Sequence, residues 1–224
     1  MVTGAFGVLG RAVCELLRER GAKVAGLDKA SSVTGALASQ CSVALGDVDL
    51  GDPESATRAV SAAVQQLGGL DSLVNIAGGF AWELVDSGNI ETWDRLYGMN
   101  VRTAVIASQA ALPALREHGV GACIVNVGSM SAQKAGRGAG AYASSKSGVA
   151  RLTEALAEEL KGEQITVNAV LPSVIDTPGN RESMPKADTS RWVAPRELAA
   201  VIAFLLSDDA RSITGALLPV AGRM

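Results

Sequence analysis

Histidine and cysteine are scarce in this 224-residue chain, which holds one histidine and three cysteines. The single His118 excludes histidine-rich zinc sites and makes a Ser-His-Asp hydrolase depend on one residue beside a glycine. Cys14, Cys41 and Cys123 are far apart and odd in number, so they outline neither a disulfide framework nor a C-x-x-C metal clip. We therefore expect no metal site and a reducing, cytoplasmic location.

Basic charge and long apolar runs are also missing. The 20 lysines and arginines are outnumbered by 23 acidic residues, which excludes a basic footprint for nucleic acid or for an anionic membrane surface. The longest apolar run, near 198–206, is well short of the roughly 20 residues that a spanning helix needs, and no signal peptide opens the chain. We expect a soluble protein whose partners include neither nucleic acid nor membrane.

The composition that remains, with 48% hydrophobic residues and 25 glycines, predicts one compact domain over 1–224. Short apolar runs alternate with longer amphipathic patterns, which is typical of repeated β-α units. The predicted strands, apolar on successive residues as in a sheet covered on both faces, are 23–27, 42–45, 72–75, 122–127, 165–171 and 216–220. The prediction is a doubly wound parallel sheet of the Rossmann type, in three α/β/α layers.

Helices are predicted from Val8 onward and over 53–68, 93–118, 141–162 and 195–207. The proline-rich stretch 173–194 has few apolar residues, so we expect an irregular, mobile loop over a substrate site. Only Met1 and Val2 precede the first glycine turn, whereas parallel strands usually run about five or six residues. We expect that the natural chain extends a few residues upstream.

A glycine-rich turn, Thr3-Gly4-Ala5-Phe6-Gly7-Val8-Leu9-Gly10, joins the first strand to an amphipathic helix, where a pyrophosphate binds helix N-terminal amides. Asp28 ends the second strand 18 residues after Gly10, at the place of an acid that accepts hydrogen bonds from the adenosine ribose. A 2′-phosphate about 4 Å away would be repelled by up to roughly 4 kcal/mol at an effective dielectric of 20. We expect NAD to be favoured, with NADP not excluded because Lys29 is adjacent.

Tyr142 and Lys146 lie four residues apart at the start of a predicted helix, so both project from one face. An ammonium close to a phenol lowers the tyrosine pKa from about 10 towards working pH and makes it a usable general acid or base. Ser129 follows the strand 122–127 at the carboxyl edge of the sheet, where α/β proteins bind ligands. The three residues together predict acid-base chemistry at this edge.

These motifs resemble the short-chain dehydrogenase/reductase family over 3–222. Its other motifs read here Asn75-Ile76-Ala77-Gly78 after the fourth strand, Asn100 on the next helix, Ser129 thirteen residues before Tyr142, and Pro172-Ser173 where the family has Pro-Gly. Two departures bear on cofactor fit: the middle glycine of the turn is displaced to Gly7, with Val8 in its usual place, and Ser173 replaces a glycine.

The resemblance implies an enzyme that transfers hydride between the nicotinamide of NAD(P) and a carbonyl or alcohol carbon of a small molecule. In the implied tetrad Tyr142 is the acid, Ser129 binds the substrate oxygen, Lys146 holds nicotinamide ribose and Asn100 positions a relay water. The implied cofactor contacts are Gly4, Phe6, Gly7, Val8, Leu9, Asp28, Asp47, Val48, Asn75, Ala77, Gly78, Tyr142, Lys146, Pro172, Ile175 and Thr177. Asp47 has an alternative as a cap for the helix at 53–68.

Segments 77–80 and 172–192 are similar to those of dihydropteridine reductases, which makes a pterin reductase the runner-up. An acyl-thioester ketoreductase is a third reading, although it would usually favour NADPH and a basic docking patch. A non-catalytic, dinucleotide-binding redox sensor is the alternative of another class, and the complete tetrad argues against it. Trp82 and Trp192 are candidate walls of the pocket, and Asn180, Arg181 and Met184 belong to the loop expected to close over substrate. Small residues on the helices 93–118 and 141–162 favour a homodimer or homotetramer.

Overall fold

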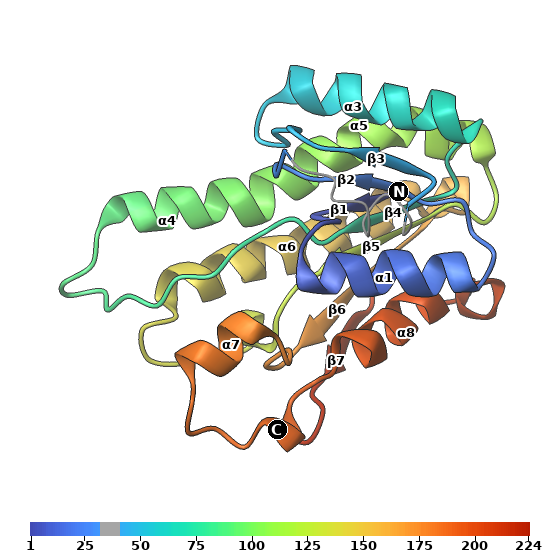
Figure 1. Ribbon diagram of the computed structural model, residues 1–224. Helices are drawn as coiled ribbons and strands as arrows, with labels where there is room; N and C mark the ends of the chain where they lie inside the picture. The colour runs from blue at the N-terminus through green and yellow to red at the C-terminus, as the bar shows by residue number, and fades with distance from the viewer. Residues whose placement is uncertain (32–40) are drawn as a thin grey trace.

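Seven parallel strands form a single sheet in the computed structural model, which describes residues 1–31 and 41–224 (Figure 1). Their order is β3-β2-β1-β4-β5-β6-β7. The strands are β1 (Val2–Thr3), β2 (Ala25–Leu27), β3 (Val43–Leu45), β4 (Ser72–Asn75), β5 (Cys123–Val127), β6 (Thr166–Pro172) and β7 (Leu217–Val220). This arrangement confirms the predicted doubly wound α/β fold.

Helices cover both faces of the sheet and bury its apolar strands. One face is covered by α3 (Pro53–Leu67), α5 (Thr103–His118) and α6 (Gly140–Leu160). The other face is covered by α1 (Val8–Glu19) and α8 (Pro195–Leu205). Every residue of β2 and β5 is buried, which explains why their sequences are apolar on successive residues instead of alternating.

The order of the strands reverses at β1, which pairs with β2 on one side and with β4 on the other. Such a switch point opens a crevice at the carboxyl ends of the strands. The turn after β1 and the segment after β4 meet there, since a Cβ built on Gly4 would lie 2.8 Å from the Ala77 nitrogen. The fold thus brings two of the predicted motifs into contact.

The predicted helix 93–118 is helical throughout but is not one regular helix. It consists of α4 (Ile90–Tyr97), a π-helical turn at Gly98–Arg102, and α5. The π-helical turn buries Asn100, which is 2% exposed. Single π-turns occur mostly inside helices near functional sites, and apolar periodicity does not reveal them.

The stretch 173–194 contains a helix, so the expectation of an irregular loop is wrong in part. Helix α7 (Pro178–Ser183) begins with a proline at its first turn, and the Thr177 hydroxyl caps it by accepting a hydrogen bond from Asn180 N at 3.2 Å. A bridge joins Ile175 to Val193, and Trp192 is only 6% exposed. Trp192 is therefore a packing residue rather than an open wall.

Over the described ranges 1–31 and 41–224, none of the helices combines the length and apolar character required to span a bilayer.

Candidate active site

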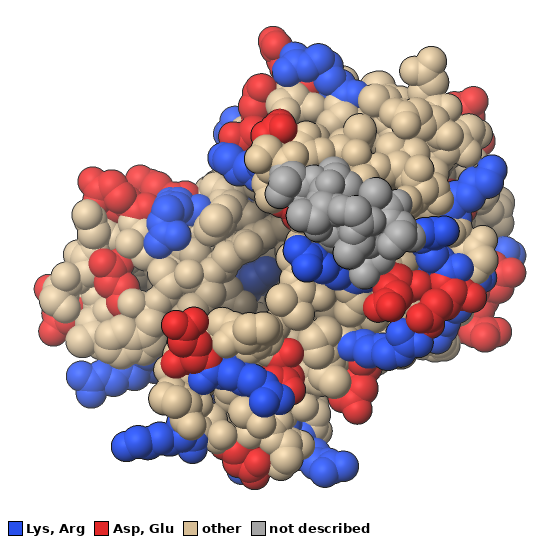
Figure 2. Space-filling model, in the orientation of Figure 1, with Lys and Arg blue, Asp and Glu red and all other residues tan. Residues whose placement is uncertain are grey.

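A cleft of about 1040 Å³ lies at the carboxyl edge of the sheet, at the switch point between β1 and β4. Figure 2 shows this face hollowed between the part that carries α4 and the part that carries α1. Ten of the predicted cofactor contacts line the cleft: Gly4, Phe6, Gly7, Val8, Leu9, Asp28, Val48, Ala77, Gly78 and Thr177.

The glycine turn is shaped for close approach of a ligand to the backbone. A Cβ built on Gly10 would lie 2.1 Å from the Gly4 carbonyl oxygen, so only glycine fits there. Gly4 itself has φ +63°, which favours glycine. Helix α1 begins after Gly7, and among the described residues no side chain caps its first amides. These open amides at the edge of the cleft suit the pyrophosphate of a dinucleotide.

Asp28 is fixed between the glycine turn and the end of β2. One carboxylate oxygen accepts a hydrogen bond from Phe6 N at 2.8 Å, and the other accepts one from Ala30 N at 3.0 Å. The neighbouring Lys29 forms an ion pair with Asp49 at 3.0 Å, and the hydrogen bond from Lys29 holds the pKa of Asp49 below its ordinary value. Lys29 is thus already engaged with an acid.

Six predicted cofactor contacts do not line the cleft: Asp47, Asn75, Tyr142, Lys146, Pro172 and Ile175. Asn75 is 5% exposed, and its amide donates to Ser108 Oγ at 3.2 Å and to Asn126 Oδ1 at 2.9 Å, so its side chain is used inside the protein. Asp47 has φ +55°, and it is Asp49 that lines the cleft. Asp47 does not cap α3 either, because Asp52 does.

The cleft also has lining residues that the sequence motifs missed, among them Arg95, Gly98, Met99 and Thr103. These lie on both sides of Asn100, at the end of α4, in the π-helical turn and at the start of α5. None of the four belongs to a motif that the sequence analysis used. The remaining lining residues are Gly10, Lys29, Ala30, Asp49, Leu50, Gly51, Ile76, Pro178 and Gly179.

The fold brings Ser129 and Tyr142, thirteen residues apart in the sequence, close enough for their hydroxyl groups to interact. Ser129 is 6% exposed and caps the short 3-10 turn Met130–Ala132, accepting from Ser131 N at 3.1 Å. Tyr142 stands on the first turn of α6. Burial raises the pKa of Tyr142, and the hydrogen bond with Ser129 lowers it by a smaller amount. The phenol is therefore protonated at neutral pH.

Lys146 is buried behind this pair, and its Nζ donates to the Val127 carbonyl oxygen at 2.8 Å. Burial lowers the pKa of Lys146 to about 8. We expected its ammonium to lower the pKa of Tyr142, and that expectation is wrong. Burial is the larger influence on the Tyr142 pKa, which lies above its ordinary value.

Asn100 completes the group from the π-helical turn. Its amide donates to the Gly79 carbonyl at 3.1 Å and to Ser145 Oγ at 2.9 Å, and its Oδ1 accepts from Gly79 N at 2.8 Å. A Cβ on Gly78 would lie 2.4 Å from this oxygen and 3.6 Å from Lys146 Nζ. The four predicted catalytic residues thus come from three parts of the fold, the π-helical turn, the end of β5 and the start of α6, and gather beside the cleft.

A family model described as "Enoyl-(Acyl carrier protein) reductase" matches residues 4–222. Among curated proteins, a 3-oxoacyl-[acyl-carrier-protein] reductase of Vibrio cholerae is 35% identical over 238 residues, covering 100% of this chain and 96% of the relative. A meso-2,3-butanediol dehydrogenase of Serratia marcescens is 32% identical over 234 residues, covering 99% of this chain and 92% of the relative.

Solved structures are similar over nearly the whole chain. A short-chain dehydrogenase/reductase from Serratia marcescens has a TM-score of 0.89 at 32% identity, and the match covers 99% of this chain and 95% of that one. A carveol dehydrogenase from Mycobacterium avium in complex with NAD has a TM-score of 0.88 at 26% identity, covering 99% and 96%.

Proposed function

Since this chain belongs to the short-chain dehydrogenase/reductase family, we propose that it reduces the carbonyl group of a small molecule with NADH as the favoured cofactor. The family makes the protein an NAD(P)-dependent oxidoreductase that acts on alcohol and keto groups. The observation that supports the finer proposal is the gathering of Ser129, Tyr142 and the buried Lys146 beside a dinucleotide-sized cleft that Asp28 lines.

The residues of the cleft fit a dinucleotide. The turn from Gly4 to Gly10 has no room for a Cβ at its last glycine, and it presents backbone amides to a pyrophosphate. Asp28 would bind the adenosine ribose, Thr177 lines the cleft, and Gly78 lines it next to Lys146. When bound, the nicotinamide supplies the hydride that reduces the carbonyl carbon.

The protein's own chemistry is the delivery of a proton and the stabilisation of charge on oxygen. Tyr142 Oη, protonated at neutral pH, donates its proton to the substrate oxygen as negative charge develops there. Ser129 Oγ hydrogen-bonds the same oxygen. Lys146, with a pKa of about 8, is mostly charged at neutral pH and would hold the nicotinamide ribose. Asn100 fixes the backbone at Gly79 beside them.

The preference for NADH is proposed from the charge at the end of β2. The Asp28 carboxylate, held by Phe6 N and Ala30 N, would repel the 2′-phosphate of NADPH. Lys29, the neighbouring cation, pairs with Asp49, which limits how far it offsets that repulsion.

The test is consumption of NADH with 2,3-butanedione as sole acceptor. We expect turnover, and a loss of 10²–10⁴-fold in Tyr142→Phe, the usual contribution of a positioned general acid. Tyr97→Phe is the matched control, because Tyr97 is 58% exposed on α4 and lies outside the proposed tetrad. A Tyr142→Phe enzyme with the wild-type rate would refute the role of Tyr142, and binding of NADH without turnover in the wild-type protein would favour a dinucleotide-binding sensor instead.

A second candidate is reduction of a 3-oxoacyl thioester, which the similarity to the Vibrio cholerae reductase favours. Acetoacetyl-coenzyme A in the same assay distinguishes it: a kcat/KM at least ten times that of the butanedione would make the thioester the better substrate. Quinonoid dihydropterin as the acceptor in the same assay tests the alternative that the protein is a pterin reductase.

We also propose that the protein assembles as a homodimer or homotetramer, through helices α5 and α6 with their many small residues. Light scattering coupled to size-exclusion chromatography distinguishes these from the 22.9 kDa monomer. The three cysteines are free and buried, which supports a location in the reducing cytoplasm.

A further inference from the structure

Two large aromatic side chains are exposed on the segment between β4 and α4. Phe80 is 60% exposed and Trp82 is 59% exposed. Figure 1 shows this segment running alongside α6, the helix that carries Tyr142. Exposed apolar groups clustered beside a reactive side chain mark a binding surface more often than chance.

Phe80 lies directly against the catalytic tyrosine. The centroids of the Phe80 and Tyr142 rings are 4.9 Å apart, with an angle of 78° between the ring planes. This is a favourable edge-to-face contact. Since most of the Phe80 side chain stays exposed in spite of it, the ring offers open apolar surface next to the hydroxyl that donates the proton.

The segment is held at both ends. At one end Asn100 binds the backbone of Gly79 through two hydrogen bonds. At the other end Trp82 Nε1 donates to the Arg137 carbonyl at 2.9 Å, and Glu83 N donates to the Gly138 carbonyl at 2.8 Å. These contacts place the two rings before any substrate arrives.

Gly138 explains how the indole is accommodated. It has φ +73°, and a Cβ built on it would lie 2.2 Å from the Trp82 ring. The indole therefore lies flush against a position that only glycine can occupy. A preorganised surface of this kind loses little conformational entropy when a ligand binds.

We propose that Phe80 and Trp82 form the substrate wall of the site and select carbonyl compounds that carry a planar, apolar ring next to the reacting carbonyl. The proposal rests on the proposed function and specifies its substrate class. A flat ring stacks on or against aromatic rings, whereas a short alkyl group or a polyol leaves the wall in contact with water.

The test compares three α-diketones with the same reacting acetyl group: 2,3-butanedione, 1-cyclohexyl-1,2-propanedione and 1-phenyl-1,2-propanedione. The cyclohexyl compound matches the phenyl compound in size and apolar character but is not flat. We expect kcat/KM to be about ten-fold higher for the phenyl than for the cyclohexyl compound, in line with the strength of aromatic pairs. Phe80→Ala should abolish this ratio, and Phe80→Trp should keep it.

Phe204→Ala is the matched control, because Phe204 is 40% exposed on α8 and lies outside this segment. The proposal is supported when the ratio of kcat/KM for the phenyl compound to that for the cyclohexyl compound falls to about one in Phe80→Ala and is unchanged in Phe204→Ala. Equal kcat/KM for the phenyl and cyclohexyl compounds, or an unchanged ratio in Phe80→Ala, would overturn it.

Failure of the proposed function has a separate signature, since it would abolish turnover of all three diketones while NADH still binds. Calorimetry then measures the binding of acetophenone to the Tyr142→Phe protein. This measurement tests the proposed aromatic wall without requiring turnover. Binding that Phe80→Ala weakens at least ten-fold supports the wall, and binding that Phe80→Ala leaves unchanged overturns it.

Discussion

Lys146 is charged at a buried position, and this has a cost for stability. Burial lowers its pKa from the ordinary 10.5 to about 8, so protonation of the folded protein is penalised by roughly 3 kcal/mol at neutral pH. Because the unfolded chain binds this proton more tightly, stability rises as the pH increases from about 8 to about 10.5. An enzyme retains such a group for its chemistry, not for its fold.

We therefore predict that Lys146→Met abolishes turnover and yet raises the free energy of unfolding at pH 7 by about 1–3 kcal/mol. The lower value allows about 2 kcal/mol for the Val127 carbonyl, which loses its donor. Urea unfolding at pH 7 and pH 10 measures both effects. The advantage of the variant should shrink to about 1 kcal/mol or less at pH 10. A constant difference at both pH values would contradict a depressed Lys146 pKa.

At the scale of one carboxylate, the proposed preference for NADH depends on Asp28. Replacing Asp28 by serine removes the charge that would face the 2′ position, so Asp28→Ser should raise the ratio of kcat/KM with NADPH to that with NADH by at least about ten-fold. Adding Asp49→Asn releases Lys29 from its ion pair and should raise the ratio further. Steady-state kinetics with both cofactors measure it, with Asp209→Asn, an exposed acid after α8, as control. An unchanged ratio would locate the preference elsewhere.

At the scale of elements, the sequence predicted the sheet well because its strands are buried on both faces and leave a continuous apolar signal. Six predicted strands overlap β2 to β7 within two residues at each end. The helix 93–118 was less well predicted, because its apolar residues give no sign of the π-turn that changes the register at Asn100. The helix α7 was missed because its proline-rich sequence also fits a loop.

For the site, as for the elements, the sequence predicted the features that a local pattern carries and missed those that depend on tertiary contacts. Ser129, Tyr142 and Lys146 were predicted as catalytic because their spacing suits acid-base chemistry, and Asn100 because its position after the fourth strand matches a motif; the structure places all four beside the cleft. Met99 and Arg95 also line the cleft, but they belong to no motif that the sequence analysis used. Asn75 was assigned to the cofactor from its motif, yet its amide is bonded to Ser108 and Asn126, a pairing between strands and a helix that no local pattern contains.

The π-helical turn also supports a prediction. Asn100→Ala would remove three hydrogen bonds and leave the Gly79 amide and carbonyl without their partner, which should lower the free energy of unfolding by about 2–3 kcal/mol. It should also lower kcat by at least about ten-fold, because Gly79 leads directly into Phe80 beside Tyr142. Thermal unfolding and initial rates measure the two effects.

Asn89→Ala is the control for that variant, since Asn89 caps α4 and accepts a hydrogen bond only from Glu91 N among the described side-chain contacts. Losing this cap should cost about 1 kcal/mol of stability and leave kcat within about two-fold. Equal losses of kcat in both variants would show that Asn100 acts through stability alone.

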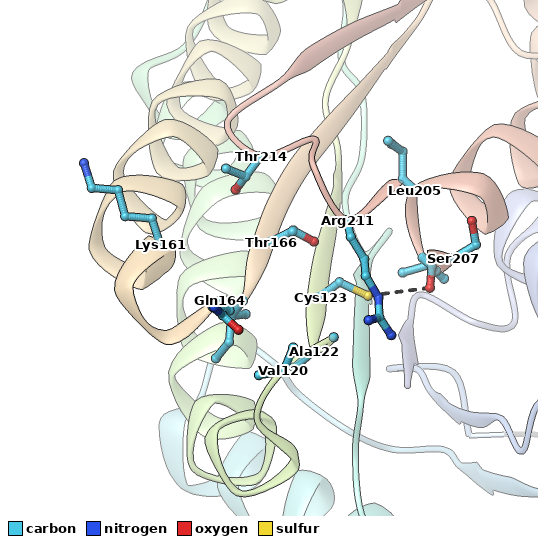
Figure 3. Close-up of a pocket in the computed structure, with 13 residues that line it drawn as sticks. Val120, Ala122, Cys123, Lys161, Gln164, Thr166, Leu205, Ser207, Arg211 and Thr214 are labelled. Atoms are coloured by element: carbon cyan, nitrogen blue, oxygen red, sulfur yellow. Dashed lines mark hydrogen bonds between the residues drawn. The ribbon is translucent and has the colours of Figure 1, made fainter. Parts of the chain in front are cut away.

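At the scale of the whole molecule, the two edges of the sheet are expected to have different uses. A second cavity, of about 340 Å³, lies at the amino ends of β5 and β6, where Cys123 and Thr166 begin their strands (Figure 3). Its Cys123 thiol donates to the Leu206 carbonyl at 4.0 Å, and burial raises the pKa of that thiol. A buried, protonated thiol that contacts backbone is a packing group rather than a nucleophile.

We predict that binding of NADH protects only the carboxyl edge from hydrogen exchange. Amides of the glycine turn, of 28–30 and of 76–79 should slow, because these segments line the large cleft, while amides at 120–123 and 205–207 should exchange at unchanged rates.

At a hundred-fold excess over Kd the ligand also adds about 2.7 kcal/mol to global stability, which slows the amides that exchange only by complete unfolding. Comparison within the first minutes of labelling, when only local openings contribute, separates the two effects. If the amino edge were protected early to the same extent as the glycine turn, the prediction would be wrong. The cofactor would then bind at both edges of the sheet or reduce local opening at both.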